Sequence, residues 1–186
     1  NHWAALGCTG WSWSDVLPYF KRSEGNERFA GRDDDALHGG TGPLHVSDLR
    51  TGNPIAQRFV EAGVAAGYRL NNDFNGPDQE GVGPYQVTQY NGERWNAARA
   101  YLHGGDKADA TFSRNRRQLT VMPDTQALRI VFEGKRAAGV VVERAGRTET
   151  LRARREVIVS SGAFGSPQLL MASGVGPAEH LRSLGI

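Results

Sequence analysis

The chain has 186 residues, of which 39% are hydrophobic, and its 22 lysines and arginines nearly balance its 20 aspartates and glutamates. This length is enough for one or two ordinary hydrophobic cores. No run of about 18 apolar residues is present, so we expect no transmembrane segment, and the first residues lack the pattern of a signal peptide. The two signs of charge are interspersed, which argues against a nucleic-acid-binding surface.

Cys8 is the single cysteine and has no partner for an internal disulfide. This favours a reducing compartment and predicts a cytoplasmic location. We expect Cys8 to be a small buried side chain, because neither a second cysteine nor a histidine cluster accompanies it. The chain begins with Asn1 instead of methionine, which agrees with a truncated N-terminus and equally with processing.

Two helices are predicted in the first third of the chain. Ser14 is the expected cap of the first, in which residues 16, 17, 19 and 20 make an apolar face and Pro18 lies in the tolerated first turn. This helix is expected to end near Gly25. The second begins at Asn53 and Pro54, a cap residue followed by proline, and its apolar residues keep helical spacing up to Gly67.

The segments between and after these helices are polar and rich in glycine. Residues 24–42 are expected to form an irregular loop, which is either a lid or a connection, and residues 44–46 alternate like a short strand. Residues 85–90 also alternate, ahead of the hairpin pair Asn91-Gly92. A short helix is predicted over residues 96–102.

From Leu119 onward the pattern predicts strands. Five β-like runs, punctuated by Gly134 and Gly146, indicate an antiparallel meander, at residues 119–122, 127–132, 137–144, 149–152 and 157–160. The segment 156–160 is continuously apolar after its first residue, as in a strand buried on both faces of a covered parallel sheet. Two helices should follow, one from Ser166 and Pro167 to Gly174, and one from Pro177 to Gly185.

The small residues Gly162 and Ala163 follow that last strand. They would let a ligand approach the main chain at the carboxyl end of a buried strand, which is where ligands bind in open α/β sheets. An ordinary strand–turn–helix connection with good caps is the alternative interpretation of the same residues.

Several blocks resemble, in order, the glucose-methanol-choline (GMC) oxidoreductase family. The segment Gly162 to Gly176 resembles the second signature of the family. The other blocks are residues 11–20, 38–44, 73–76 with 80–83, 92–94 with 97–102, and 136–140. The link at residues 104–110 is longer than usual for the family, and Arg116-Arg117 stand where Pro-Asn is usual, which leaves the geometry between two portions of the chain open.

The resemblance implies an α/β flavoprotein that binds FAD, with α+β character in its substrate part. Residues 1–114 would form a lid and substrate-domain portion, and residues 115–186 a portion of the FAD-binding domain with its sheet and meander. The family oxidises a primary alcohol to an aldehyde by hydride transfer to flavin. Its glycine fingerprint and its catalytic histidine have no match here, so we expect an internal segment that contains no catalytic residue.

The resemblance also implies four cofactor-binding residues. Val121 matches the position where the meander of the family meets the adenine end of FAD; its alternative role is that of a core strand residue. Ser161, Gly162 and Ala163 match the small-residue turn beside the adenosine and phosphate part. The helix after them would add a favourable dipole if its N-terminus points that way.

The histidines show no spacing typical of a catalytic dyad or of a metal site, so no metal is expected. His38 opens the family-like block at residues 38–43, and a loop-bracing hydrogen bond is the preferred role over proton transfer. Residues 85, 86, 89 and 90 could line an alcohol pocket, although sheet packing is the preferred interpretation.

The sequence thus predicts a segment of an FAD-dependent alcohol oxidoreductase whose partner is a small alcohol, more similar to the choline and alcohol dehydrogenases than to the sugar oxidases. A non-catalytic binding or structural module that keeps the scaffold without flavin is the alternative.

Overall fold

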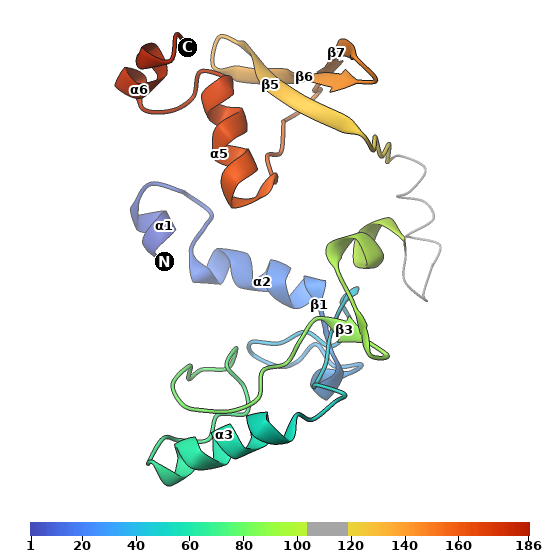
Figure 1. The fold of residues 1–186 in the computed structure, drawn as a ribbon, viewed down its shortest axis with the longest axis vertical. Coiled ribbons are helices and arrows are strands. Elements are labelled where there is room, and N and C mark those ends of the chain that lie inside the picture. Colours follow the sequence, from blue (N-terminus) through green and yellow to red (C-terminus); the bar gives the residue numbers. More distant parts are fainter. Residues whose placement is uncertain (104–118) are drawn as a thin grey trace. The chain divides into compact units, whose positions relative to one another are not determined.

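A computed structural model describes residues 1–103 and 119–186. The chain divides into two compact units, residues 1–119 and 120–186 (Figure 1). The predicted boundary at 114/115 and the lengthened link at 104–110 lie outside the described residues. The assignment of a substrate portion and an FAD portion on either side of that boundary therefore stays a prediction.

Short elements joined by long connections make up the first unit. β1 pairs in parallel with β2, and β3 pairs antiparallel with β4. The elements are α1 (His2–Ala5), α2 (Trp13–Ser23), β1 (Glu24–Asn26), η1 (Glu27–Phe29), β2 (Leu44–Val46), α3 (Pro54–Ala65), β3 (Gln89–Tyr90), β4 (Glu93–Arg94) and η2 (Ala98–Leu102).

The N-terminus of α2 lies earlier than predicted. Ser12, and not Ser14, is the cap: its hydroxyl accepts from the Asp15 N–H, and the Asp15 side chain accepts from the Ser12 N–H at 3.0 Å. This capping box satisfies two orphan donors of the first turn, which a cap at Ser14 would not do. As a result Pro18 lies inside the helix and not in its first turn.

α3 confirms the prediction made from Asn53 and Pro54. The Asn53 side-chain oxygen accepts from the Ile55 N–H at 2.9 Å, and Pro54 occupies the first helical position. Ile55 and Phe59 are 78% and 72% exposed, so in the described structure nothing covers much of the apolar face of α3.

The buried interior of the first unit is largely polar. Asn26, His38, Ser47 and Asn71 are all buried. The loop predicted for residues 24–42 is wrong at its start, where residues 24–26 form β1. A run of polar residues and glycines resembles a solvated loop in sequence, but here the same groups bond to one another away from water.

Glycines in the block at residues 38–43 let two backbones touch. A Cβ built on Gly39 would lie 1.9 Å from the Lys21 carbonyl oxygen, and one on Gly40 would lie 1.7 Å from that of Phe29. No side chain fits at such separations. These residues are therefore packed against α2 and η1 instead of forming an open lid.

The predicted hairpin forms at Asn91 and Gly92, which both have positive φ, as a two-residue turn between twisted strands requires. Most of the strand predicted for residues 85–90 is absent, since only residues 89–90 belong to β3. Val87 instead makes an isolated bridge with Ser47. Beyond the hairpin, the Trp95 Nε1 donates to the Pro43 carbonyl oxygen at 2.9 Å.

The second unit is a three-stranded antiparallel meander with two helices. β5 (Thr125–Glu133), β6 (Arg136–Arg144) and β7 (Arg147–Arg152) pair in sequence order, and α5 (Gly162–Ala172) and α6 (Ala178–Ser183) follow (Figure 1). Tight turns at Gly134 and at Gly146 connect the strands, as predicted. A small apolar core is buried in this unit, made of Ile130, Ala138, Val142 and Leu181.

Two of the five predicted β runs are not strands. Residues 119–122 and 156–160 have no strand partner among the described residues. The expectation that residues 156–160 are buried on both faces is wrong here, because Ile158 is 79% exposed. A parallel strand is defined by neighbours that accept and donate its main-chain hydrogen bonds, and apolar character alone does not supply them.

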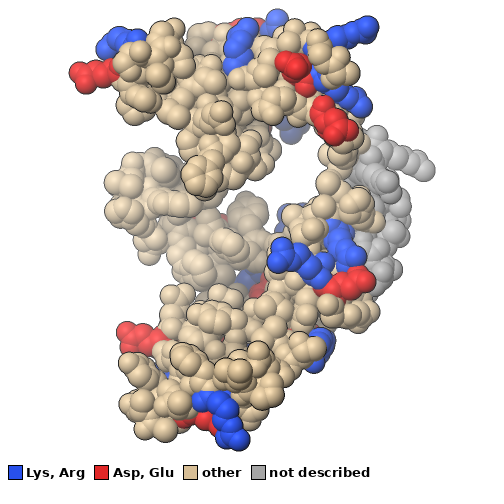
Figure 2. Space-filling model, in the orientation of Figure 1, with Lys and Arg blue, Asp and Glu red and all other residues tan. Residues whose placement is uncertain are grey.

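The surface carries both signs of charge. In Figure 2 the basic and acidic side chains are scattered over the visible face, with no continuous area of one sign.

Cys8, expected to be buried, is exposed. None of the helices in the described ranges is long and apolar enough to cross a membrane.

Candidate functional site

The predicted cofactor-binding turn lies at the start of α5. The helix begins at Gly162 and not at Ser166, with Ser161 at the cap position, and Pro167 is accommodated inside it. Ser166 does not cap the helix but accepts from the Ser161 N–H through its hydroxyl oxygen, at 2.9 Å. Gly162 and Ala163 are therefore the first residues of the helix itself, and Ser161 is its cap.

The N-terminus of α5 is open to a ligand. Gly162 has φ +82°, and a Cβ placed there would meet nothing within 4 Å. No side chain caps the first turn, and the turn contains no acidic residue. The exposed N–H groups and the helix dipole favour an anionic group at such a position. This donor set fits the phosphate or ribose part of a dinucleotide such as FAD.

Val121 lies before β5, outside any helix or strand, and is 59% exposed. Its alternative role as a core strand residue is therefore wrong. It belongs to the same unit as the Ser161–Ala163 turn. The structure brings the three turn residues together because they are consecutive, and it leaves Val121 on the surface with its main chain outside any strand.

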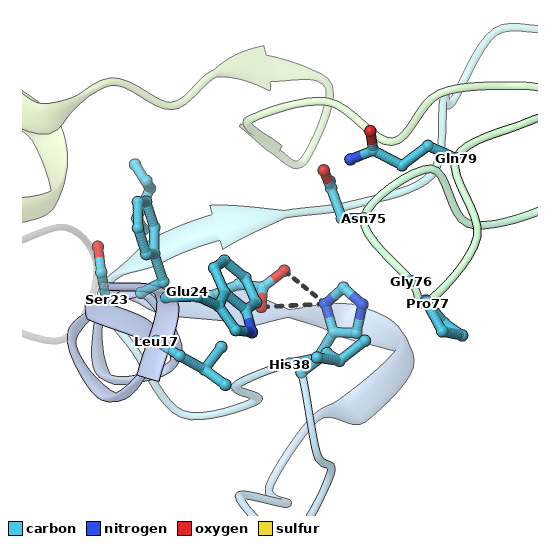
Figure 3. Close-up of a pocket in the computed structure, with 12 residues that line it drawn as sticks. Leu17, Ser23, Glu24, His38, Asn75, Gly76, Pro77 and Gln79 are labelled. Atoms are coloured by element: carbon cyan, nitrogen blue, oxygen red, sulfur yellow. Dashed lines mark hydrogen bonds and ion pairs between the residues drawn. The ribbon is translucent and has the colours of Figure 1, made fainter. Parts of the chain in front are cut away.

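A cavity of about 790 Å³ lies in the first unit. One side of the cavity is apolar and comes mainly from α2. Asn75 and Gln79 lie on the opposite side, and Glu24 and His38 lie between the two sides (Figure 3). The lining residues are Trp13, Leu17, Phe20, Ser23, Glu24, Leu37, His38, Leu44, Asn75, Gly76, Pro77 and Gln79.

His38 forms the centre of a buried hydrogen-bond cluster beside this cavity. Its Nδ1 lies 3.1 Å from each carboxylate oxygen of Glu24, and its Nε2 lies 3.0 Å from Oδ2 of Asp73. The ring stacks on Phe29, with the ring centroids 4.7 Å apart. Burial alone would lower the pKa of His38, but the carboxylates of Glu24 and Asp73 outweigh it and raise the pKa above its ordinary value of 6.5.

These contacts are of the loop-bracing kind predicted for His38. Its partners Glu24 and Asp73 were not predicted, and neither was the role of Asn26. Asn26 is fully buried, and its side-chain nitrogen donates to Glu24 at 3.0 Å and to Gln86 at 2.8 Å. The glycines after His38 were the available signal, because they allow the close main-chain approach that buries this cluster.

In the part of the chain that the structure describes, no group of three side chains is arranged to hold a metal ion.

The residues considered for an alcohol pocket pack against their neighbours. The Gln86 nitrogen donates to Asp48 at 3.1 Å, and Gln89 donates to the Asp48 carbonyl oxygen at 2.7 Å. Tyr85 stacks on Phe74, and Tyr90 stacks on His45. Gln86 and Gln89 also line a second cavity, of about 670 Å³, so the alcohol-pocket interpretation stays a prediction beside the packing one.

The family model described as GMC oxidoreductase matches residues 1–185. The chain belongs to the GMC oxidoreductase family. Oxygen-dependent choline dehydrogenases of Rhizobium etli and Brucella ovis are each 46% identical to it over its whole length. The chain spans about a third of the length of these relatives, 32% in both cases.

Solved structures show the same likeness. Pyridoxine 4-oxidase from Mesorbium loti matches with a TM-score of 0.78 and 30% identity, over 97% of this chain and 33% of that one. An FAD-dependent oxidoreductase from Chaetomium thermophilum matches with a TM-score of 0.78 and 26% identity, over 99% of this chain and 32% of that one.

These comparisons confirm the GMC resemblance and the α/β fold class predicted from the sequence. They also agree with FAD as the cofactor expected of a GMC protein, since the Chaetomium thermophilum oxidoreductase is FAD-dependent. The roles predicted for Val121, Ser161, Gly162 and Ala163 stay predictions.

Proposed function

We propose that this chain is part of an FAD-dependent alcohol oxidoreductase that oxidises a primary alcohol to an aldehyde. The observation that carries the proposal is the match of the GMC model to residues 1–185, together with 46% identity to choline dehydrogenases across the chain. Choline, a primary alcohol, is the first substrate to test because of those relatives. We also propose that residues 1–114 form a lid and substrate-domain portion, that residues 115–186 form a portion of the FAD-binding domain, and that the protein is cytoplasmic.

In this proposal the start of α5 holds part of FAD. The main-chain N–H groups of Gly162 and Ala163 face the ligand, and the absence of a Cβ at Gly162 lets it come close. Ser161 keeps its hydroxyl free of a capping bond and so available to the ligand. Val121 contributes through its main chain at the adenine end.

The proposed reaction removes two electrons and two protons from the alcohol. The carbon that bears the hydroxyl group loses a hydride, the hydroxyl oxygen loses a proton to a base, and a carbonyl bond forms. Bound FAD supplies the acceptor for the hydride. We assign no residue of this chain as the base, and the contribution of the chain is to bind and orient.

The test uses the complete gene product that contains these residues. Purified under mild conditions, it should be yellow, and choline or another primary alcohol should bleach the visible flavin absorbance in the absence of oxygen. A matched quaternary ammonium ion without the hydroxyl group, tetramethylammonium, should leave the spectrum unchanged.

Two outcomes would contradict the proposal at different points. A colourless protein that takes up no added FAD would favour the alternative, a scaffold module without chemistry. A yellow protein that neither choline nor aliphatic or aromatic alcohols bleach would keep the cofactor but reject the reaction class.

A further inference from the structure

The contacts of His38 require a particular protonation state. Both ring nitrogens lie within 3.1 Å of a carboxylate oxygen, Nδ1 with Glu24 and Nε2 with Asp73. A neutral imidazole has one N–H, so one of its nitrogens would point a lone pair at a carboxylate. An imidazolium donates on both sides and makes two charge-assisted hydrogen bonds.

Each carboxylate partner is fixed in a different part of the first unit. Glu24 belongs to β1 and also accepts from the Gly39 N–H, at 3.0 Å. Asp73 lies in the segment 71–83, where its main-chain N–H donates to the Asn71 side chain at 2.8 Å. The His38 ring therefore bridges β1 and the segment 71–83, which are far apart in the sequence.

The Asp73 end of this bridge shapes one wall of the cavity. The Asp73 carboxylate accepts from the Asn75 N–H at 3.0 Å. The main-chain carbonyl oxygen of Asp73 accepts from the Gly76 N–H at 3.3 Å. Asn75, Gly76, Pro77 and Gln79 are the wall opposite α2 (Figure 3). Releasing Asp73 from His38 would remove a buried anchor of that wall.

We propose that His38 is held as an imidazolium between Glu24 and Asp73, and that this cation fastens the cavity wall at residues 75–79, so that loss of its proton loosens the wall. This makes His38 a positioning residue. The inference is independent of the proposed reaction, because it concerns only contacts inside the first unit.

The charges around the ring decide the direction of the pH dependence. Glu24 of β1 and Asp73 face its nitrogens, and Asp35 in its own loop accepts from the His38 main-chain N–H at 2.8 Å. Lys21 of α2 bonds to the Asp35 carbonyl oxygen, and Phe29 of η1 is uncharged.

Because the folded pKa of His38 is raised, its contribution to stability is complete below about 6.5, the value of an unperturbed histidine. That contribution is lost as the pH rises through the folded pKa.

The first measurement needs no mutation. Exchange of the imidazole C2 hydrogen, followed by mass spectrometry of the complete protein across pH, reports the titration of individual histidines. His38 should titrate above about 6.5, the value of an unperturbed histidine. Titration of His38 at or below about 6.5 would overturn the proposal.

The second measurement compares His38→Gln with His180→Gln, the same substitution at a buried and at an exposed histidine. Main-chain hydrogen exchange of residues 71–83 should be about tenfold faster in His38→Gln at pH 6, as for the loss of a buried charged hydrogen bond. His180→Gln should match the unmodified protein.

Asp73→Asn tests the same ion pair independently, in case His38→Gln does not fold. This substitution keeps the size of the side chain and removes only its charge. It should also speed exchange in residues 71–83, and it should lower the midpoint of His38. Equal exchange in all proteins, or an unchanged midpoint in Asp73→Asn, would show that the ion pair does not hold the wall.

Discussion

The main-chain N–H of Ile130 in β5 donates to the side-chain oxygen of Ser173, 2.7 Å away at the end of α5. β5 is an edge strand of the three-stranded sheet, so N–H groups on its outer side have no strand partner. The Ser173 hydroxyl also donates to the Leu169 carbonyl oxygen at 2.5 Å. One side chain therefore satisfies the strand edge and ties the helix to it.

Replacing Ser173 with alanine should loosen α5 from the sheet. The Ile130 N–H would lose its acceptor in a partly buried position, which costs about 1–2 kcal/mol. Hydrogen exchange of peptides that cover residues 125–133, measured in the complete protein, should accelerate by about 5- to 30-fold. Ser183→Ala is the control, because its hydroxyl bonds only to the His180 carbonyl oxygen at the surface. Equal acceleration in the two variants would contradict this role of Ser173.

Gly40→Ala should prevent the first unit from folding as observed. Its Cβ would lie 1.7 Å from the Phe29 carbonyl oxygen and 2.6 Å from that of Arg32, so the main chain must move. We expect a loss of more than about 4 kcal/mol, seen as poor soluble yield or a lower unfolding temperature. Gly52→Ala, at a glycine with no atom within 4 Å of the added carbon, should change stability by less than about 0.5 kcal/mol. A normal Gly40→Ala protein would mean that this loop is not packed as described.

Local signals predicted the elements whose hydrogen bonds are local. The cap at Asn53, the proline at 54 and the helical spacing after them are enough to specify α3, since a helix makes its main-chain bonds within one segment. The same holds for β5, β6 and β7, where turns at Gly134 and Gly146 join strands that pair with their sequence neighbours.

Sequence patterns failed where a residue depends on distant partners. Residues 156–160 have the composition of a buried strand, but a strand needs neighbours, and none of the described residues pairs with them. The His38 cluster was missed for a related reason: Glu24 and Asp73 are 14 and 35 positions away, so no local spacing indicates their contact. The four predicted cofactor-binding residues came from the resemblance. Only the start of α5, four residues earlier than predicted, came from the structure.

The start of α2 should weaken in acid. Hydrogen bonds from the Ser12 hydroxyl and from the Ser12 main chain hold the pKa of Asp15 below its usual value of 3.8. A lowered folded pKa means that the stabilisation is present above the unfolded value and is lost as the pH falls through the folded one. Protection of the amides in residues 12–16, measured against their intrinsic exchange rates at each pH, should therefore fall below pH 3.8 in the unmodified protein. Asp15→Asn should remove this dependence, and a persistent acid transition in Asp15→Asn would assign it to another group.

Gly162 and Gly174 allow a matched test of the proposed FAD contact. Both have φ +82° with no atom near an added Cβ, and they lie at opposite ends of α5. Alanine at either position should therefore cost about the same strain, about 1–2 kcal/mol, because an L-residue resists the left-handed conformation. Only at Gly162 would the added methyl group also stand where the first N–H groups of the helix are proposed to meet FAD.

We therefore expect Gly162→Ala and Gly174→Ala to lower the unfolding temperature of the complete apoprotein equally, while FAD affinity falls about tenfold only in Gly162→Ala, a difference of about 1.4 kcal/mol. Flavin released from a known amount of denatured protein, after equilibration with limiting FAD, gives the occupancy. If the two variants retain equal amounts of FAD, the α5 N-terminus does not hold the cofactor. A fall in both variants would point to general destabilisation, since the C-terminal end of α5 has no free N–H groups to offer a phosphate.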